Sequence, residues 1–170
     1  MEIINLIILF FAYIIPMYLA NATPIVIHGK KPLDFGLKLK GKRILGDGKT
    51  IVGTIAGIVC GTIAGILLGL AFPSVLILIP NYFLLTFLLA VGAILGDAIE
   101  SFIKRRLGFS QGDAWFIFDQ LDFILGGLIL ACLIRIPEIE LVVIILFITI
   151  IMHVISNVCA HKVGLKKVPW

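Results

Sequence analysis

Three aspartates in the second half of the chain have the residue types and spacing of a cation site. Asp119 and Asp122 are three residues apart, so they share one face if the segment is helical, and Asp97 closes the preceding apolar run. Carboxylates without neighbouring His or Cys suit Mg²⁺, or Mn²⁺, rather than zinc. The spacing therefore indicates a magnesium site formed by Asp97, Asp119 and Asp122, although simple pairing of these acids with nearby cations fits the pattern as well.

Basic side chains lie next to these acids. Glu100, Ser101 and Lys104 follow Asp97 at intervals of three, four and seven residues, which places all four on one helical face. The run from Lys104 to Arg106 then adds positive charge. A divalent cation beside Lys and Arg at a membrane is the equipment needed for phosphate chemistry on a lipid.

The glycine-rich segment 46–50 precedes another apolar run and favours an anion. It is not a P-loop, because Arg43 occupies the position where that motif requires its first glycine. Exposed amides and Lys49 at a helix start still attract phosphate. A plain junction between a loop and a helix explains the same residues equally well.

The composition excludes both a water-soluble domain and a disordered chain. The 170 residues are 61% hydrophobic and 14% charged, and the mean hydropathy is +1.17. We expect one all-α integral membrane domain over residues 1–170, because the apolar runs have the length of membrane-spanning helices. About five spans are predicted, at 3–20, 50–71, from between Ser74 and Asn81 to about Asp97, 118–136 and 141–160.

The basic residues predict how this domain is oriented. Of 14 Lys and Arg residues, all but Arg135 lie in the segments 21–49, 100–117 and 161–170. The positive-inside rule assigns these three segments to the cytoplasm. The expected protein is a multi-pass protein of the cell membrane, with its N-terminus outside, its C-terminus inside and a polar site formed by the cytoplasmic segments.

Five glycines recur at every fourth residue in the second predicted span, which makes one smooth helix face. The strip favours tight packing within the bundle, but a groove for a lipid chain or a homodimer seam has the same pattern. Gly92 and Gly96 in the third span offer a matching surface. The strip consists of Gly53, Gly57, Gly61, Gly65 and Gly69.

Several motifs, in order along nearly the whole chain, resemble the archaeal CDP-archaeol synthase family. They are Asn21-Ala-Thr-Pro24, Asp34-Phe-Gly36, the segment 43–50, Gly96-Asp97, the segment 101–106, Asp119-Gln-Leu-Asp122 and Lys167-Val-Pro-Trp170. The second half is also similar to the CDP-diacylglycerol synthases. It departs from them at Gln120, where that family has Arg or Lys, and it lacks their Pro-Gly-His-Gly-Gly stretch.

The resemblance implies a Mg²⁺-dependent cytidylyltransferase of membrane phospholipid biosynthesis. Its substrates would be CTP and unsaturated archaetidic acid, which is 2,3-di-O-geranylgeranylglyceryl phosphate, and its products CDP-archaeol and pyrophosphate. The catalytic residues would be Asp97, Asp119, Asp122 and Lys104, with the three aspartates as metal ligands. The nucleotide would be bound by Gly46, Asp47, Gly48, Lys49, Thr50, Ser101 and Arg105. Arg43 or Arg106 would hold the lipid phosphate.

Two other functions remain open at this point. A CTP-dependent polyprenol kinase would share the nucleotide site but transfer the γ-phosphoryl group. A small membrane cation carrier would also use intramembrane acids, but it would need neither the segment 46–50 nor a clustered basic face. No nucleic acid partner is expected, and the sequence leaves a homodimer open.

Overall fold

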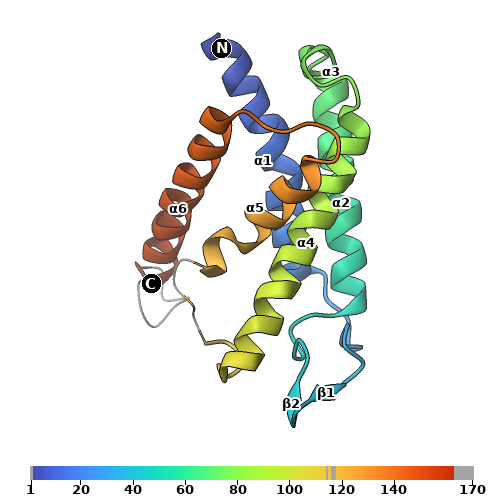
Figure 1. Ribbon diagram of the computed structural model, residues 1–170, viewed down its shortest axis with the longest axis vertical. Coiled ribbons are helices and arrows are strands. Elements are labelled where there is room, and N and C mark those ends of the chain that lie inside the picture. Colours follow the sequence, from blue (N-terminus) through green and yellow to red (C-terminus); the bar gives the residue numbers. More distant parts are fainter. Residues whose placement is uncertain (1, 114, 116–117, 163–170) are drawn as a thin grey trace.

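The computed structural model describes residues 2–113, 115 and 118–162, of which 153, 156–157 and 159–162 are described by their backbone alone. Within this part of the chain the architecture is a helical bundle with one small hairpin (Figure 1). Its elements are α1 (Ile3–Val26), β1 (Lys38–Leu39), β2 (Lys42–Arg43), α2 (Ile51–Ala71), α3 (Ser74–Leu78), α4 (Tyr82–Leu107), α5 (Phe118–Ala131) and α6 (Ile139–Lys162).

The centre of the bundle is formed by α1, α2 and α4, each of which packs against the other two. Helix α5 packs mainly along α4, and α6 contacts α5 and α1. In Figure 1 the hairpin lies at one end of the bundle, while α3 lies at the other end beside the N-terminus. Large buried side chains such as Tyr13, Tyr82 and Phe123 fill the space between the helices.

The all-α membrane fold is confirmed, with helices in all five predicted segments. Among the described residues, α1, α2 and α4 are long and apolar enough to cross a membrane, and α6 has a shorter apolar stretch at Ile139–Met152. Helix α5 has 14 residues, about 21 Å at 1.5 Å per residue, which is shorter than the roughly 30 Å hydrocarbon core. The number of spans therefore stays a prediction.

Helix α4 continues past the end of its predicted span at Asp97 to Leu107, so Asp97, Glu100, Ser101 and Lys104 share one helix, as predicted. Two other boundaries were wrong. Helix α1 continues past Ala20 to Val26. Helix α5 ends at Ala131 rather than at Ile136.

The glycine strip of α2 packs within the bundle, as the packing interpretation predicted. All five glycines are buried. A Cβ atom at Gly57 would lie 2.6 Å from the carbonyl oxygen of Ala20 in α1, and one at Gly65 would lie 1.7 Å from Oγ1 of Thr86 in α4. Because both neighbours approach this face of α2, the strip is neither a lipid groove nor a dimer seam.

Gly92 and Gly96 do not face the strip, so the prediction of a matching surface was wrong. They allow α5 to approach α4 instead. A Cβ atom at Gly92 would lie 2.4 Å from the carbonyl oxygen of Gly126, and one at Gly96 would lie 2.1 Å from that of Asp122. This close backbone approach places the start of α5 beside the acidic face of α4.

The segment between α1 and α2 is folded by a two-residue β-hairpin turn. Leu39 pairs with Lys42, and the turn residues Lys40 and Gly41 have φ values of 51° and 79°. Two positive φ values are typical of a tight hairpin turn, which favours glycine at one of the two positions. The hairpin is the only strand structure in the described residues and was not predicted.

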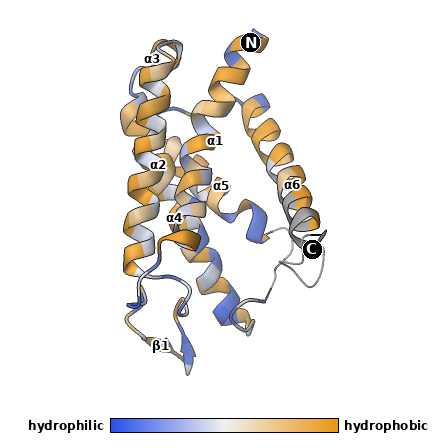
Figure 2. Cartoon of the chain, turned by 180° about the vertical axis from the view of Figure 1, so that it is seen from behind, coloured by the Kyte–Doolittle hydropathy of each residue, from blue (hydrophilic) through white to orange (hydrophobic). Residues whose placement is uncertain are grey.

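The described polar segments gather at one end of the bundle. Figure 2 shows hydrophilic residues at the hairpin, at the nearby end of α4 and at the start of α5, with apolar helices beyond them. Arg135 lies at the opposite end, where it donates a 2.5 Å hydrogen bond to the carbonyl oxygen of Leu78. The end that carries the hairpin is therefore the predicted cytoplasmic end, and the orientation stays a prediction. Most of the predicted cytoplasmic tail, 163–170, lies outside the described residues.

Candidate active site

A polar cavity of about 400 Å³ lies where the loop before α2, the second half of α4 and the start of α5 meet. We call it the polar cavity. It brings together all three predicted metal ligands with Lys49, Ser101, Lys104 and Arg105, although these residues come from segments far apart in the sequence. Its lining consists of Leu45, Gly48, Lys49, Asp97, Glu100, Ser101, Lys104, Arg105, Gln111, Gly112, Asp119 and Asp122.

Lys104 is the buried cation of this cavity, with 7% of its surface exposed. Its Nζ atom lies 3.0 and 3.1 Å from the two carboxylate oxygens of Asp119 and 3.3 Å from Oε1 of Glu100. A buried ammonium group is tolerated when it is paired and hydrogen-bonded in this way. The pairing joins the acidic face of α4 to the first turn of α5.

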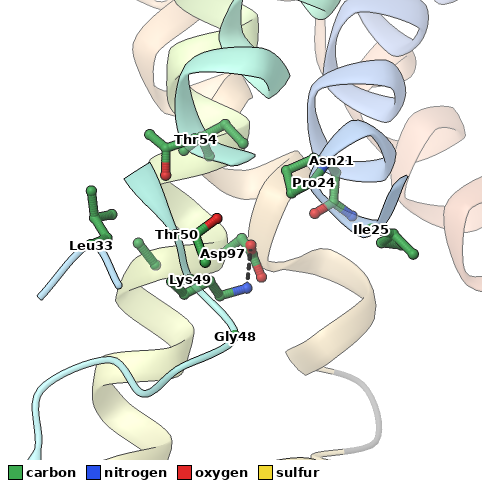
Figure 3. A pocket seen from close by; sticks show the side chains of 11 residues that line it. Asn21, Pro24, Ile25, Leu33, Gly48, Lys49, Thr50, Thr54 and Asp97 are labelled. Atoms are coloured by element: carbon green, nitrogen blue, oxygen red, sulfur yellow. Dashed lines mark hydrogen bonds and ion pairs between the residues drawn. The ribbon is translucent and has the colours of Figure 1, made fainter. Parts of the chain in front are cut away.

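Lys49 forms the second ion pair of the cavity. Its ammonium group contacts a carboxylate oxygen of Asp97, and the two side chains point toward one another in Figure 3. Lys49 belongs to the loop before α2, whereas Asp97 lies in α4. The contact therefore connects the predicted nucleotide loop with the predicted metal site.

Asp122 differs from the other two aspartates. Its carboxylate accepts a 2.6 Å hydrogen bond from the backbone N–H of Phe123, and it has no ion pair among the described residues. Within those residues, no three His, Cys, Asp or Glu side chains lie close enough to form a ready metal cage. The structure thus gathers the three aspartates in one cavity, but two of them are paired with lysines.

Asp34 organises the loop in front of the cavity. The Arg43 guanidinium donates to both of its carboxylate oxygens, with its Nη2 atom 2.7 Å from Oδ1. The backbone N–H groups of Gly36, Leu45 and Gly46 also donate to this carboxylate. Burial alone would raise the pKa of Asp34, but Arg43 and the three backbone donors hold it well below its usual range.

Arg43 and Arg106, predicted to hold the lipid phosphate, both have structural partners. Arg43 binds Asp34 and Asp47. Arg106 donates to the backbone carbonyl groups of Leu39, Lys42 and Arg43, which fastens the hairpin to α4. Neither arginine lines the polar cavity. Their assignment to the lipid phosphate stays a prediction.

The predicted nucleotide segment 46–50 is only partly in the polar cavity. Gly48 and Lys49 line it. The N–H of Gly46 is bound to Asp34, and Asp47 is paired with Arg43. The hydroxyl group of Thr50 accepts a 3.1 Å hydrogen bond from the backbone N–H of Gly53, so Thr50 caps the start of α2.

A second cavity, of about 260 Å³, lies between the ends of α1, α2 and α4 (Figure 3). We call it the Asn21 cavity. It shares Gly48, Lys49 and Asp97 with the polar cavity, so the Lys49–Asp97 pair lies between the two. The complete lining is Asn21, Pro24, Ile25, Leu33, Gly48, Lys49, Thr50, Thr54, Ile94, Asp97 and Ala98.

Some residues of the site were missed by the sequence reasoning. Asn21 and Asp34 were noticed only within motifs of the family resemblance. Gln111 lines the polar cavity, and its side-chain amide lies 3.5 Å from where a Cβ atom at Gly48 would be. An isolated glutamine in a polar loop carries no sequence signal that could have identified it.

Comparisons with known proteins agree with the resemblance. The profile of the CarS-like CDP-archaeol synthase family matches residues 3–170. CDP-archaeol synthases of Methanospirillum hungatei and Pyrococcus horikoshii are 40% and 41% identical, with 92% and 94% of this chain and 99% and 95% of theirs covered. A solved structure described as an intramembrane enzyme for archaeal membrane lipids biosynthesis superposes with a TM-score of 0.79 at 37% identity. That superposition covers 87% of this chain and 92% of the other.

Proposed function

Because the chain belongs to the CDP-archaeol synthase family, we propose that it transfers CMP from CTP to the phosphate of an unsaturated archaeal glycerol-ether lipid. The products are CDP-archaeol and pyrophosphate. The observation that carries the proposal is the polar cavity, where Lys49, Lys104 and Arg105 lie among three aspartates. A cavity with both signs of charge, at the end of an apolar bundle, suits a nucleotide that must meet a lipid.

The reaction needs no protein nucleophile. An oxygen of the lipid phosphate attacks the α-phosphorus of CTP, and the bond from that phosphorus to the β-phosphate oxygen breaks, so that pyrophosphate leaves in line. Catalysis then consists of positioning and charge neutralisation. In this proposal Lys104 and Arg105 hold the triphosphate, and Lys49 lies where the two substrates meet.

We propose Mg²⁺ as the cofactor, with Mn²⁺ as a substitute. The aspartate carboxylates of the polar cavity fit this cation, because Mg²⁺ usually takes one or two protein carboxylates and completes its shell with phosphate oxygens and water. Asp122 has no ion pair among the described residues, and Asp97 and Asp119 are each held by a single lysine. When bound, the cation would neutralise charge on the phosphates, and Asp122 with Asp97 or Asp119 would hold it.

The site faces the cytoplasm in this proposal, where CTP is available. The charge distribution supports it, because the described basic segments lie at the end with the polar cavity and Arg135 lies at the other. Cysteine labelling in intact cells tests it. A cysteine in place of Lys40 should react only after the membrane is permeabilised, and one in place of Arg135 should react from outside. The reverse pattern would overturn the orientation.

The proposed activity is tested with CTP carrying a radioactive label on either its α- or its γ-phosphorus. Purified protein is incubated with each CTP, Mg²⁺ and digeranylgeranylglyceryl phosphate. Label from the α position alone should enter the lipid, and pyrophosphate should form. Label from the γ position in a lipid would identify a kinase. Failure to use CTP, with Mg²⁺ moving across vesicles, would favour the cation carrier.

A further inference from the structure

The polar cavity and the Asn21 cavity meet at a single ion pair, and the proposed cytidylyl transfer would use two such spaces. Lys49 and Asp97 line both the polar cavity and the Asn21 cavity. In-line transfer brings the lipid phosphate and the leaving pyrophosphate to opposite sides of the α-phosphorus. Two anionic groups therefore have to approach one centre from different directions, and a shared cation between two cavities provides that arrangement.

Size and charge assign the nucleotide to the polar cavity. It has about 400 Å³ against about 260 Å³ for the Asn21 cavity. It also has Lys104 and Arg105, which the smaller cavity lacks. A triphosphate with its ribose and base requires the larger, more highly charged space.

The Asn21 cavity has the mixed lining that a lipid headgroup requires. Asn21 and Thr54 contribute an amide and a hydroxyl group, and Lys49 contributes the cation. The wall also includes Thr50 and Asp97, the ion-pair partner of Lys49, and apolar residues such as Pro24 and Ile25. Ile25 is 78% exposed at the end of α1. Figure 3 shows Asn21 and Thr54 on α1 and α2, on either side of the Lys49–Asp97 contact.

Another opening near the site is less suited to an anionic headgroup. An apolar groove between α4 and α5 also reaches the polar cavity, and its walls include Ile103 and Leu125. Among its described lining residues, the acidic or basic ones are Glu100 and Asp122, both carboxylic acids. No cation among the described residues lines the groove to offset those carboxylates, whereas the one carboxylate of the Asn21 cavity, Asp97, is paired with Lys49.

We propose that the Asn21 cavity is the binding site for the lipid phosphate, with the Asn21 amide and the Thr54 hydroxyl as its hydrogen-bond donors and Lys49 as the cation shared with CTP. The inference rests on the proposed function and deepens it. It moves the lipid phosphate away from Arg43 and Arg106, whose guanidinium groups hold the loop and the hairpin. Asn21 and Thr54 are thereby specificity-determining residues for the lipid and not for the nucleotide.

The test measures KM for each substrate separately in the full chain in detergent micelles. The variants are Asn21→Leu and Thr54→Val, which keep size but remove the hydrogen-bonding group. The matched control is Asn81→Leu, at the other end of the bundle, where the asparagine side chain makes no capping hydrogen bond. We expect KM for digeranylgeranylglyceryl phosphate to rise about tenfold or more in both site variants. KM for CTP should change by less than about twofold, and Asn81→Leu should resemble the wild type.

A binding measurement without turnover distinguishes the loss of the lipid site from misfolding of the variant. The thermal shift caused by the lipid phosphate alone should disappear in Asn21→Leu, while the shift caused by Mg²⁺ and CTP should persist. Glycerol 1-phosphate and inorganic pyrophosphate are tested in parallel. A pyrophosphate shift that is lost in Asn21→Leu, with no shift by the lipid phosphate in the wild type, would assign the cavity to the leaving group and overturn the proposal.

Kinetic outcomes separate this inference from the proposed function. An active protein in which both site variants keep the wild-type KM for the lipid would refute the Asn21 site and leave the function intact. So would a raised lipid KM in Ile103→Trp, which fills the α4–α5 groove, with none in Asn21→Leu. A wild-type protein that forms no cytidylylated lipid would refute the proposed function itself.

Discussion

Replacing Gly96 with alanine should disable the site by moving Asp122. The added Cβ atom would lie 2.1 Å from the backbone carbonyl oxygen of Asp122, whereas ordinary contact begins at 3.4 Å. The two helices must therefore separate by about 1.3 Å at this point, because a backbone atom cannot rotate away as a side chain does. Overpacking of this kind costs about 1–3 kcal/mol of stability.

The effect on turnover should exceed the effect on stability. A misplacement of about 1 Å can lower a rate about 100-fold. We expect the kcat of Gly96→Ala to fall by roughly that factor, with a higher Mg²⁺ requirement, because Asp122 is a proposed metal ligand. Steady-state assays over a Mg²⁺ series measure both quantities, and thermal unfolding in detergent measures the stability.

Gly69→Ala is the matched control for this prediction. It makes the same exchange in a buried helical glycine, but in α2, and its nearest neighbours are ring atoms of Tyr82 and Phe83 at 3.0 Å or more. Those rings can shift slightly, so activity and Mg²⁺ dependence should stay near the wild type. A Gly96→Ala enzyme with lowered stability but normal kcat and normal Mg²⁺ dependence would show that the position of Asp122 does not govern the reaction.

Three further predictions concern the charged residues. Lys49→Ala should raise KM for CTP about tenfold or more, since a lost charge-assisted contact is worth about 1.5–3 kcal/mol. Asp119→Asn should abolish most synthesis and lower the unfolding temperature, because it removes one of the two carboxylate partners of buried Lys104. Asp113→Asn should be mild because Asp113 is exposed in its loop. Asp34 has a lowered pKa, so its ionised form stabilises the fold fully above the unfolded value of about 3.9 and that stabilisation is lost below it. The unfolding temperature should therefore fall between pH 5 and pH 3 in the wild type, and less so in Asp34→Asn.

The effect expected for Asp119→Asn shows how the structure changes a sequence-based argument. From spacing alone, relief of repulsion among three carboxylates would make the Asn variants as stable as the wild type or more so. The structure places Lys104 between Asp119 and Glu100. Removing one partner of a buried cation is costly, and so the expected direction reverses for this aspartate.

Much of the fold was predictable because membrane helices have a strong sequence signal. The apolar runs located α1, α2, α4, α5 and α6. The recurrence of glycine at every fourth residue identified the packed face of α2. Helix ends were harder to predict, because α1 continues past Ala20 and α5 ends before Ile136. The polar end of α4 followed from the shared helical face, but its packing against α5 and the hairpin did not. Hydropathy does not record such packing.

The site was predictable as a set of residues but not as an arrangement. The sequence already grouped Asp97 with Asp119 and Asp122 and assigned Lys49 to the nucleotide. The structure adds that Lys49 is paired with Asp97 in the same cavity. The sequence could not show that Arg106 would hold the hairpin against α4, or that Lys49 would lie between two cavities. Those facts depend on tertiary contacts across about 50 residues or more of chain, and the sequence periodicities that reveal helices carry no information about them.

The most direct test of the central claim is the position of the metal ion in crystals grown with CTP and Mn²⁺. Anomalous diffraction locates Mn²⁺ without ambiguity. We expect a peak inside the polar cavity, bonded to the carboxylate of Asp122 and of one further aspartate and to phosphate oxygens of CTP, with metal–oxygen distances of roughly 2.0–2.3 Å. CTP and Mn²⁺ bound elsewhere, with Lys49 and Lys104 still paired to Asp97 and Asp119, would contradict the assignment of the polar cavity as the active site.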